Sequence, residues 1–307
     1  MTSKDINISC SSSVPVLSPF FITGFSDAES SFNIRISPNK NHSTGWLVEL
    51  SYQVGLHKKD LALLELINSA LGAVGRIRKR SKGADIIEFR VSSLKGLTAI
   101  IAHFDKYPLI SQKLADYILF KQAFEIVKQK EHLTKAGLQK IVNIRASINK
   151  GLPLKLKDSF PCTIAVARPL IIDQEIKNPD WLAGFVSGYG SFMIHIQNSS
   201  THKIGFAVKL KLQVTQHARD IGLMKKMVEY LGCGMYKLRP NGLAGDFLVL
   251  RFSDIRDKVI PFFNLYPIQG AKALDFEGFC KVANIIEANG HLTPDGLEQI
   301  RSLKSKE

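Results

Sequence analysis

The amino-acid sequence predicts an α+β fold, a pseudo-twofold tandem duplication of one αββαββα-type domain. Residues 18–36, SPFFITGFSDAESSFNIRI, recur at an offset of 160 as residues 178–196, NPDWLAGFVSGYGSFMIHI. A second segment, HLTKAGL at 132–138, recurs as HLTPDGL at 291–297. After each copy of the first segment the period of the apolar residues changes from about 3.6 to about 2, as expected where strands follow a helix. The repeat of about 130 residues is far longer than a solenoid unit, so each copy is predicted to be a domain.

The duplication also sets the predicted domain boundaries. These are a flexible lead at 1–17, a first repeat at 18–150, an interdomain linker at 151–177 and a second repeat at 178–307. The lead is rich in serine and has Lys4 as its only basic residue, which matches neither a secretory signal nor a transit peptide. The linker contains three prolines and interrupts the duplication.

Each repeat is predicted to open with a helix. A capping residue, Ser18 or Asn178, precedes a proline at the first helical position in both copies. Small residues spaced four apart lie on one helix face and allow two backbones to approach closely. These small pairs are Gly24 with Ala28 and Gly184 with Gly188. We therefore expect the two helices to pack against each other and to bring Glu29 and Tyr189 to one shared centre.

Antiparallel strands with one buried face are predicted to follow each first helix. Apolar and polar residues alternate over 32–37, 46–54 and 206–215. Further helices are expected at 60–71, 94–106 and 112–129, with counterparts at 220–231, 254–263 and 270–288. The two predicted sheets are antiparallel and saddle-like, one in each repeat.

The composition is strongly basic. Lysine and arginine outnumber aspartate and glutamate by 41 to 27, which gives a formal net charge of +14 and an isoelectric point near 9.6. This balance predicts a polyanionic partner, with nucleic acid ahead of a membrane surface. The sequence has no apolar run long enough for a spanning helix. Its four cysteines lie far apart without zinc or disulfide spacing, so we expect reduced thiols.

The polar faces of the predicted sheets carry residue types that contact duplex DNA. A two-stranded ribbon fits the major groove, where arginine, lysine, asparagine and glutamine match base edges and phosphates. The stretch RIRKR at 76–80 places three arginines on one face of a third strand. A merely solvated face is the alternative for a single strand, but repetition in both halves favours nucleic acid. The predicted DNA-contacting residues are Ser31, Asn33, Arg35, Ser37, Asn39, Glu49, Ser51, Gln53, Arg76, Arg78 and Arg80 in the first repeat, and Ser191, Met193, His195, Gln197, Lys209, Lys211, Gln213, Thr215, Lys237 and Arg239 in the second.

The segments ITGFSDAES (22–30) and LAGFVSGYG (182–190) resemble the signature helices of single-chain, two-repeat LAGLIDADG homing endonucleases. The segments QVTQH, HFDKYPLISQKLADYILFKQAF and EHLTKAGL resemble the fungal, organelle-encoded members, and the resemblance covers nearly the whole chain. It implies a monomer that binds a long duplex DNA site and hydrolyses one phosphodiester bond on each strand. It also implies Mg²⁺ or Mn²⁺ as the cofactor, Ca²⁺ as a substitute that does not support cleavage, and a mitochondrial location.

In that family the last acidic residue of each signature helix binds a divalent metal at the helix interface. Glu29 matches this position, and the carbonyl groups of Ala28 and Gly188 match auxiliary ligands. Mg²⁺ prefers carboxylate oxygens and offsets the charge of a phosphodiester. Tyr189 stands at the second acidic position, and a phenol with a pKa of roughly 10 is a poor ligand for Mg²⁺. Cleavage of both strands is therefore expected to be weak or absent.

Three further residues near the predicted site have a functional interpretation and an ordinary one. Gln216 resembles the family's water-organising residue, but it also fits an ordinary glutamine at a strand end. Arg251 resembles the basic residue near the scissile phosphate, but it also fits a surface ion pair. Asp27 is expected to cap or orient its neighbours rather than to bind metal.

Tyr189 itself has competing interpretations. Cleavage was lost while DNA binding was retained, or the residue was replaced to trap uncleaved DNA, or the protein turned to RNA splicing or gene regulation. A tyrosine nucleophile has no supporting residues in the sequence. The alternative class of function is therefore a protein that only binds, either a DNA regulator or an RNA maturase with intron RNA as its partner.

Overall fold

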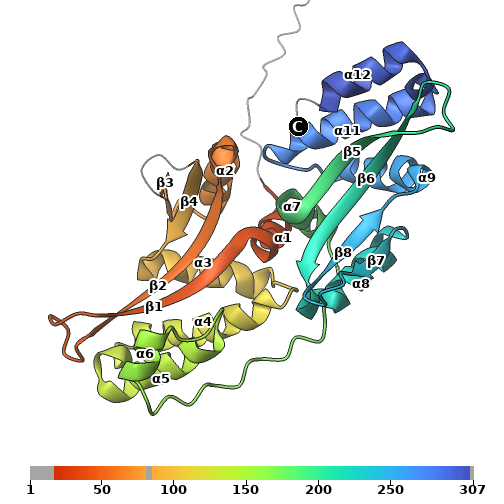
Figure 1. Cartoon of the computed structure of the whole chain (residues 1–307). Coiled ribbons are helices and arrows are strands. Elements are labelled where there is room, and N and C mark those ends of the chain that lie inside the picture. Colours follow the sequence, from red (N-terminus) through yellow and green to blue (C-terminus); the bar gives the residue numbers. More distant parts are fainter. Residues whose placement is uncertain (1–16, 81–84, 305–307) are drawn as a thin grey trace, which may run out of the picture.

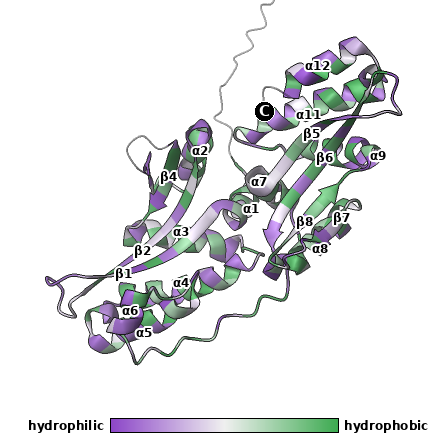
Figure 2. Cartoon of the chain, viewed as in Figure 1, coloured by the Kyte–Doolittle hydropathy of each residue, from purple (hydrophilic) through white to green (hydrophobic). Residues whose placement is uncertain are grey.

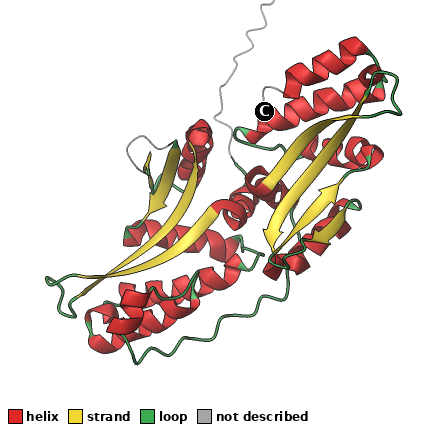
Figure 3. Ribbon diagram, viewed as in Figure 1, coloured by secondary structure: helices red, strands yellow, loops and turns green. Residues whose placement is uncertain are grey.

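The chain folds into two halves of the same architecture. A computed structural model describes residues 17–80 and 85–304. Each half contains a four-stranded antiparallel sheet with helices packed on it, and the helices α1 and α7 lie at the centre between the two sheets (Figures 1 and 3). The expected lead at 1–17 lies outside the described residues except for Leu17.

The first half begins with α1 (Pro19–Glu29), which runs directly into the sheet. Its elements are β1 (Ser30–Pro38), β2 (Trp46–His57), η1 (Lys58–Asp60), α2 (Leu61–Ala70), β3 (Arg76–Lys79), β4 (Ile86–Val91), α3 (Leu94–Lys106), α4 (Lys113–Lys128), η2 (Glu131–Leu133), α5 (Lys135–Ser147) and α6 (Leu154–Ser159). The strand order is β1-β2-β4-β3, and every neighbouring pair is antiparallel.

The second half repeats this sequence of elements. They are α7 (Pro179–Tyr189), β5 (Gly190–Asn198), β6 (Phe206–His217), η3 (Ala218–Asp220), α8 (Ile221–Leu231), β7 (Met235–Leu238), β8 (Ala244–Val249), α9 (Phe252–Asp254), the π-helix η4 (Ile255–Val259), α10 (Ile260–Leu265), α11 (Lys272–Glu287), η5 (Gly290–Leu292) and α12 (Pro294–Lys304). The strand order β5-β6-β8-β7 is also antiparallel throughout. The predicted α+β duplication is confirmed.

Each sheet buries its apolar face under helices, as the alternation in the sequence predicts (Figure 2). The same strand position anchors both cores. The ring of Phe32 in β1 lies 5.3 to 5.6 Å from the rings of Tyr52, Phe104, Tyr117 and Phe120. The ring of Phe192 in β5 lies 4.9 to 5.7 Å from those of Phe263, Phe276 and Phe279. Within the described residues, no helix has the length and apolar character to cross a membrane.

The two first helices meet through their small residues, as expected. A Cβ atom added at Gly24 would clash with the carbonyl oxygen of Trp181 on α7, and one added at Gly184 would clash with that of Phe21 on α1. A Cβ atom at Gly188 would collide with the Cβ atom of Ala28. The backbones are therefore in direct contact, and the seam has no room for side chains at these positions.

Some elements differ from the sequence predictions or were not located by them. The expected linker contains the short helix α6, whereas residues 161–178 contain neither helix nor strand. The sequence pattern did not predict the strands β4 and β8 or the helices α5 and α12. The helix expected at 254–263 extends over 252–265 and contains a π turn, because Pro261 has no amide hydrogen to continue the regular hydrogen bonding.

Candidate active site and nucleic-acid interface

Glu29 and Tyr189 are the last residues of α1 and α7, and a strand begins immediately after each of them. Since the two helices pack along their length, both side chains emerge at the same end of the seam. The Glu29 side chain lies beside Gly188, where an added Cβ atom would be 3.1 Å from its Cγ atom. The structure therefore brings the two positions to one centre.

The Glu29 carboxylate faces a small cavity of about 140 Å³. Burial raises the pKa of Glu29, the ammonium groups of Lys272 and Lys113 lower it, and the Asp60 carboxylate raises it again. Asp60 and Lys272 line the same cavity, together with Leu56 from the end of β2. A carboxylate held between two ammonium groups beside an open cavity can receive a cation together with a phosphate.

Two half-buried lysines complete the centre, and neither was predicted from the sequence. The Nζ atom of Lys113 donates hydrogen bonds to the carbonyl oxygens of Ser26 at 2.7 Å and Ala28 at 3.0 Å. The Nζ atom of Lys272 donates to Gly188 O at 2.5 Å. Burial is the largest influence on both lysines and lowers each pKa to about 8. A signal existed in the sequence, because SQKLAD at 111–116 recurs as GAKALD at 270–275 with the lysine and the aspartate retained.

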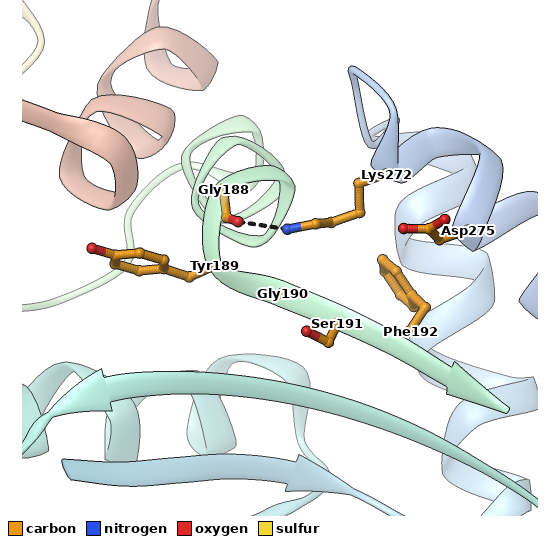
Figure 4. Close-up of a pocket in the computed structure, with 7 residues that line it drawn as sticks. All are labelled: Gly188, Tyr189, Gly190, Ser191, Phe192, Lys272 and Asp275. Atoms are coloured by element: carbon orange, nitrogen blue, oxygen red, sulfur yellow. Dashed lines mark hydrogen bonds between the residues drawn. The ribbon is translucent and has the colours of Figure 1, made fainter. Parts of the chain in front are cut away.

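Tyr189 occupies the corresponding place in the second half but provides no anionic oxygen at neutral pH. Its side chain is 38% exposed, and its ring contacts that of Phe185 edge to face at 5.8 Å. Burial raises the pKa of the phenol, and the nearby Glu29 carboxylate raises it further. Figure 4 shows the ring pointing away from Lys272 and Asp275. The second centre therefore presents a neutral hydroxyl group where the first presents a carboxylate.

The oxygen atoms at the centre fit a divalent metal at Glu29 but not at Tyr189. The carbonyl oxygens of Ala28 and Gly188 each accept one lysine hydrogen bond, and a carbonyl oxygen has a second lone pair. Among the described residues, no three histidine, cysteine, aspartate or glutamate side chains are placed to enclose a metal ion. Mg²⁺ often binds through one or two carboxylates and completes its shell with substrate phosphate and water. Glu29 meets this requirement, and Tyr189 does not.

Gln216 and Arg251 lie on the second half. Gln216 is half-buried near the end of β6, and its Oε1 atom accepts the His217 amide at 2.8 Å. Arg251 directly precedes α9 with a 79% exposed side chain, and its Nε atom lies 4.0 Å from an Asp254 carboxylate oxygen. Among the described hydrogen bonds, neither side chain reaches Glu29. A catalytic role for Gln216 and for Arg251 therefore stays a prediction.

Asp27 has the orienting role that was expected for it. It is buried, and its carboxylate accepts the Ile110 amide at 3.0 Å, the Ser111 amide at 3.2 Å and the Ser111 hydroxyl. It also accepts the Trp181 Nε1–H group of α7 at 2.8 Å. With both oxygens engaged, Asp27 ties α1 to the segment before α4 and to the other half.

Most predicted DNA-contacting residues lie on one polar face of their sheet. In the first half Arg35, Arg76 and Arg78 line an open hollow of about 710 Å³. In the second half Lys211, Gln213, Lys237 and Arg239 line one of about 400 Å³. The third strands are shorter than predicted, so Arg80 and Arg239 follow β3 and β7 rather than lying within them.

Ser51 corrects one expectation about this face. Its side chain is not available at the surface, because the residue is only 2% exposed. The Gln53 Nε2 atom donates to the Ser51 hydroxyl oxygen at 3.0 Å, and the Asn33 Nδ2 atom donates to Gln53 Oε1 at 3.2 Å. These longer side chains cover the serine, an arrangement that strand alternation alone does not reveal.

Acidic residues on the same faces hold several of the arginines. Arg35 pairs with Glu49 at 3.3 Å, and Arg78 pairs with Glu88 at 3.7 Å. Asp246 on β8 accepts from Arg239 at 2.8 Å and also accepts hydrogen bonds from Thr215 and Gln213. Asp246 was not predicted from the sequence, because the sequence pattern does not reveal β8. Acidic neighbours thus hold part of each basic face.

The fold and the centre together define a two-repeat nuclease architecture, and the comparison with family models agrees. The model described as LAGLIDADG endonuclease matches residues 22–124 and 182–283, one match in each half. The chain therefore belongs to the LAGLIDADG endonuclease family, in its two-repeat form. The proposed resemblance is confirmed.

Several relatives are intron-encoded endonucleases of fungi. The probable intron-encoded endonuclease 3 of Neurospora crassa is 39% identical over 288 residues, which cover 94% of this chain and 54% of that protein. The probable intron-encoded endonuclease 2 of the same fungus is 38% identical over 300 residues, which cover 94% of this chain and 65% of that protein. The chain thus spans between about half and two thirds of the length of these relatives.

Solved structures of the family match over nearly the whole chain. I-SmaMI bound to an uncleaved DNA target in the presence of calcium ions has a TM-score of 0.92 and 46% identity, covering 94% of this chain and 98% of that one. The same homing endonuclease bound to cleaved DNA also has a TM-score of 0.92. I-CpaMI bound to uncleaved DNA has a TM-score of 0.88 and 42% identity, covering 94% and 98%.

Proposed function

We propose that this protein is a sequence-specific homing endonuclease that binds a long duplex DNA site and hydrolyses phosphodiester bonds with a divalent metal. The observation that carries the proposal is that the end of α1 provides a carboxylate, Glu29, whereas the end of α7 provides a phenol, Tyr189. We call each helix end with its surroundings a half-site, so the Glu29 half-site is complete and the Tyr189 half-site is incomplete. Binding covers both halves of the DNA site, whereas hydrolysis is efficient on one strand at most. The product is a slow nick rather than a double-strand break.

The two polar sheet faces support DNA as the ligand. Each contains an open hollow lined by arginine or lysine, and the formal charge of the chain is +14. Long sites need a long surface, and two sheets joined at a central seam provide it with the cleavage centre in the middle. I-SmaMI and I-CpaMI, which share the fold at more than 40% identity, were each solved with DNA.

In the complete half-site, the Glu29 carboxylate would hold Mg²⁺ or Mn²⁺, with the free lone pairs of the Ala28 and Gly188 carbonyl groups as auxiliary ligands. When bound, the metal offsets phosphate charge and lowers the pKa of a bound water. Lys272 lines the cavity beside Glu29, and its ammonium group would offset charge on a scissile phosphate bound there. Gln216 and Arg251 are assigned assisting roles at the other strand. Ca²⁺ would bind at Glu29 without supporting cleavage.

Because Tyr189 replaces a carboxylate, the second helix end lacks a metal ligand and its negative charge. A neutral phenol supplies neither the charge nor the ligand geometry that Mg²⁺ needs. The loss should exceed that of one oxyanion-hole donor, which costs roughly 2.7–4 kcal/mol in the transition state. Cleavage of the corresponding strand is therefore slowed by at least about two orders of magnitude.

The proposed location of the protein rests on its similarity to its relatives. The intron-encoded relatives of fungi support an organellar origin, and we assign the protein to mitochondria. A single chain contains both half-sites, which supports a monomer as the active form. Intron RNA is the alternative partner, and the groove-sized strand pairs favour duplex DNA over it.

The test is cleavage of the two DNA sequences that flank the reading frame, joined as one uninterrupted site, in Mg²⁺ and in Mn²⁺. The protein as given is compared with Tyr189→Glu and with Tyr189→Phe as the matched control. We expect double-strand breaks from Tyr189→Glu alone. Equal cleavage by the unmodified protein would contradict the two-carboxylate argument. Tight binding in Ca²⁺ without any cleavage by Tyr189→Glu would indicate a DNA-binding regulator, and tighter binding of intron RNA would indicate a maturase.

A further inference from the structure

Two aspartates connect the halves through reciprocal hydrogen bonds. Asp60 ends η1 of the first half, and Asp220 ends η3 of the second. The Asp60 Oδ1 atom accepts the backbone amide of Ala271 at 2.6 Å. The Asp220 Oδ1 atom accepts the backbone amide of Gln112 at 2.7 Å. Each aspartate therefore binds the start of a helix in the opposite half.

The two helices that receive these carboxylates are the ones that carry the half-buried lysines. Ala271 directly precedes Lys272 in α11, and Gln112 directly precedes Lys113 in α4. A carboxylate at a helix start satisfies a free amide and interacts favourably with the helix dipole. The lysine is the first helical residue, so its direction depends on how the first turn is held.

The packing around both aspartates is close. Gly270 has a φ of +73° and leaves space for Asp60, whose Oδ1 atom would lie 2.6 Å from a Cβ atom at that position. Asp220 is 2% exposed and also accepts the Nε2–H group of Gln174, from the segment that joins the halves, at 2.9 Å. Such contacts fix the distance between the halves at the two places where the lysines enter the centre.

We propose that Asp60 and Asp220 are positioning residues, each of which holds the opposite half's lysine in the cleavage centre. Asp60 positions Lys272, which binds the Gly188 carbonyl, and Asp220 positions Lys113, which binds the Ala28 carbonyl. The importance of the lysines for cleavage rests on the proposed function, whereas their positioning does not. The two halves therefore assemble the centre jointly, and neither half can place its own lysine alone.

The test is site-resolved acetylation of lysines in the full chain without DNA, followed by mass spectrometry over a pH series. In Asp60→Ala the labelling rate of Lys272 should rise roughly fivefold, the change that a lost helix cap typically gives, while that of Lys113 stays unchanged. Asp220→Ala should give the opposite pattern. Asp60→Asn and Asp220→Asn keep an acceptor oxygen, so their labelling should stay close to the parent once the pH series has accounted for the lower pKa that loss of the Asp60 charge gives Lys272. Asp158→Ala, at an exposed position of α6, is the matched control.

The crossed pattern separates positioning from general loosening. A rise at the lysine of the same half, an equal rise at both lysines or no rise at either would overturn the proposal. If Asp220→Ala does not fold, the labelling pattern of Asp60→Ala alone decides the proposal. A second measurement in the Tyr189→Glu background should show that Asp60→Ala slows cleavage at saturating DNA without changing the DNA affinity. Failure of all cleavage would contradict the proposed function and leave the labelling result valid.

Discussion

The two ends of the central seam differ at the position that closes each first helix, where Glu29 stands in one half and Tyr189 in the other. Lys272, Lys113 and Asp60 lie around Glu29, and Arg219 and Asp220 lie around Tyr189. Helix packing, lysine contacts and aspartate contacts are the same in kind on both sides. The scaffold of the centre therefore persists in the half where the carboxylate is absent.

This comparison also separates structural from chemical requirements. Tyr189 rests against Phe185, so the seam tolerates a large ring at the end of α7 without losing the close helix contact above it. The seam glycines Gly24 and Gly184 do not tolerate a larger residue, since an added Cβ atom would clash with a carbonyl oxygen of the opposite helix. Chemistry at the helix ends is thus replaceable, and packing between the helices is not.

The largest effect is expected from removing the one remaining carboxylate. Glu29→Gln keeps the size of the side chain but removes the charge that would hold the metal, so residual nicking should fall by more than about two orders of magnitude. DNA affinity measured in EDTA should stay within about twofold of the parent, because the sheet faces are unchanged. Unchanged nicking by Glu29→Gln would break the comparison, because the two helix ends would then be equivalent.

The two lysines sharpen the comparison. In the Tyr189→Glu background, Lys272→Met should slow one strand and Lys113→Met the other, each by roughly two orders of magnitude, the typical cost of a lost electrostatic contact in a transition state. Strand-resolved cleavage of end-labelled DNA measures both rates. Equal slowing of both strands by either variant would contradict a separate lysine for each half-site.

The seam glycines should behave alike, in contrast to the helix ends. Gly24→Ala and Gly184→Ala each push a methyl group against a backbone carbonyl of the other helix, and overpacking of this kind costs about 1–3 kcal/mol. Urea unfolding should show similar losses of the free energy of unfolding for both. Gly55→Ala, at a position with open space, is the control. A neutral result at either seam position would contradict the close helix contact.

The remaining expected effect concerns the pH dependence of stability. Burial lowers the pKa of Lys113 and of Lys272 to about 8, below the values in the unfolded chain. The folded state therefore binds fewer protons than the unfolded state above pH 8, and the free energy of unfolding rises with pH there. The rise is at most about 1.4 kcal/mol per pH unit for each lysine, less for the partly exposed Lys272, and ends near pH 10.5. Lys113→Met/Lys272→Met should flatten this slope in urea titrations, and an unchanged slope would contradict the assignment.

The sequence predicted the duplicated fold, the helix seam and the shared position of Glu29 and Tyr189, because these depend on local repetition and on the spacing of small residues. It did not identify Lys113 or Lys272, since their role arises from contacts with carbonyl groups more than 80 residues away along the chain. The contacts of Asp60 and Asp220 join different halves, and no local pattern encodes such pairs.

The polar sheet faces show the same limit. Strand alternation assigned each residue to a side of the sheet, and this holds for the arginines of β3. It did not show that Gln53 and Asn33 cover Ser51, or that Asp246 holds Arg239. Both depend on which strands are neighbours, and the order β1-β2-β4-β3 cannot be derived from the alternation of a single strand.

The most direct test moves the carboxylate from one helix to the other. The strand that is nicked is mapped on end-labelled target DNA for the protein as given and for Glu29→Gln/Tyr189→Glu. We expect the unmodified protein to nick one strand and the double variant to nick the opposite strand. A nick that stays on the same strand in both proteins would show that the helix-end carboxylate does not determine where the DNA is cut.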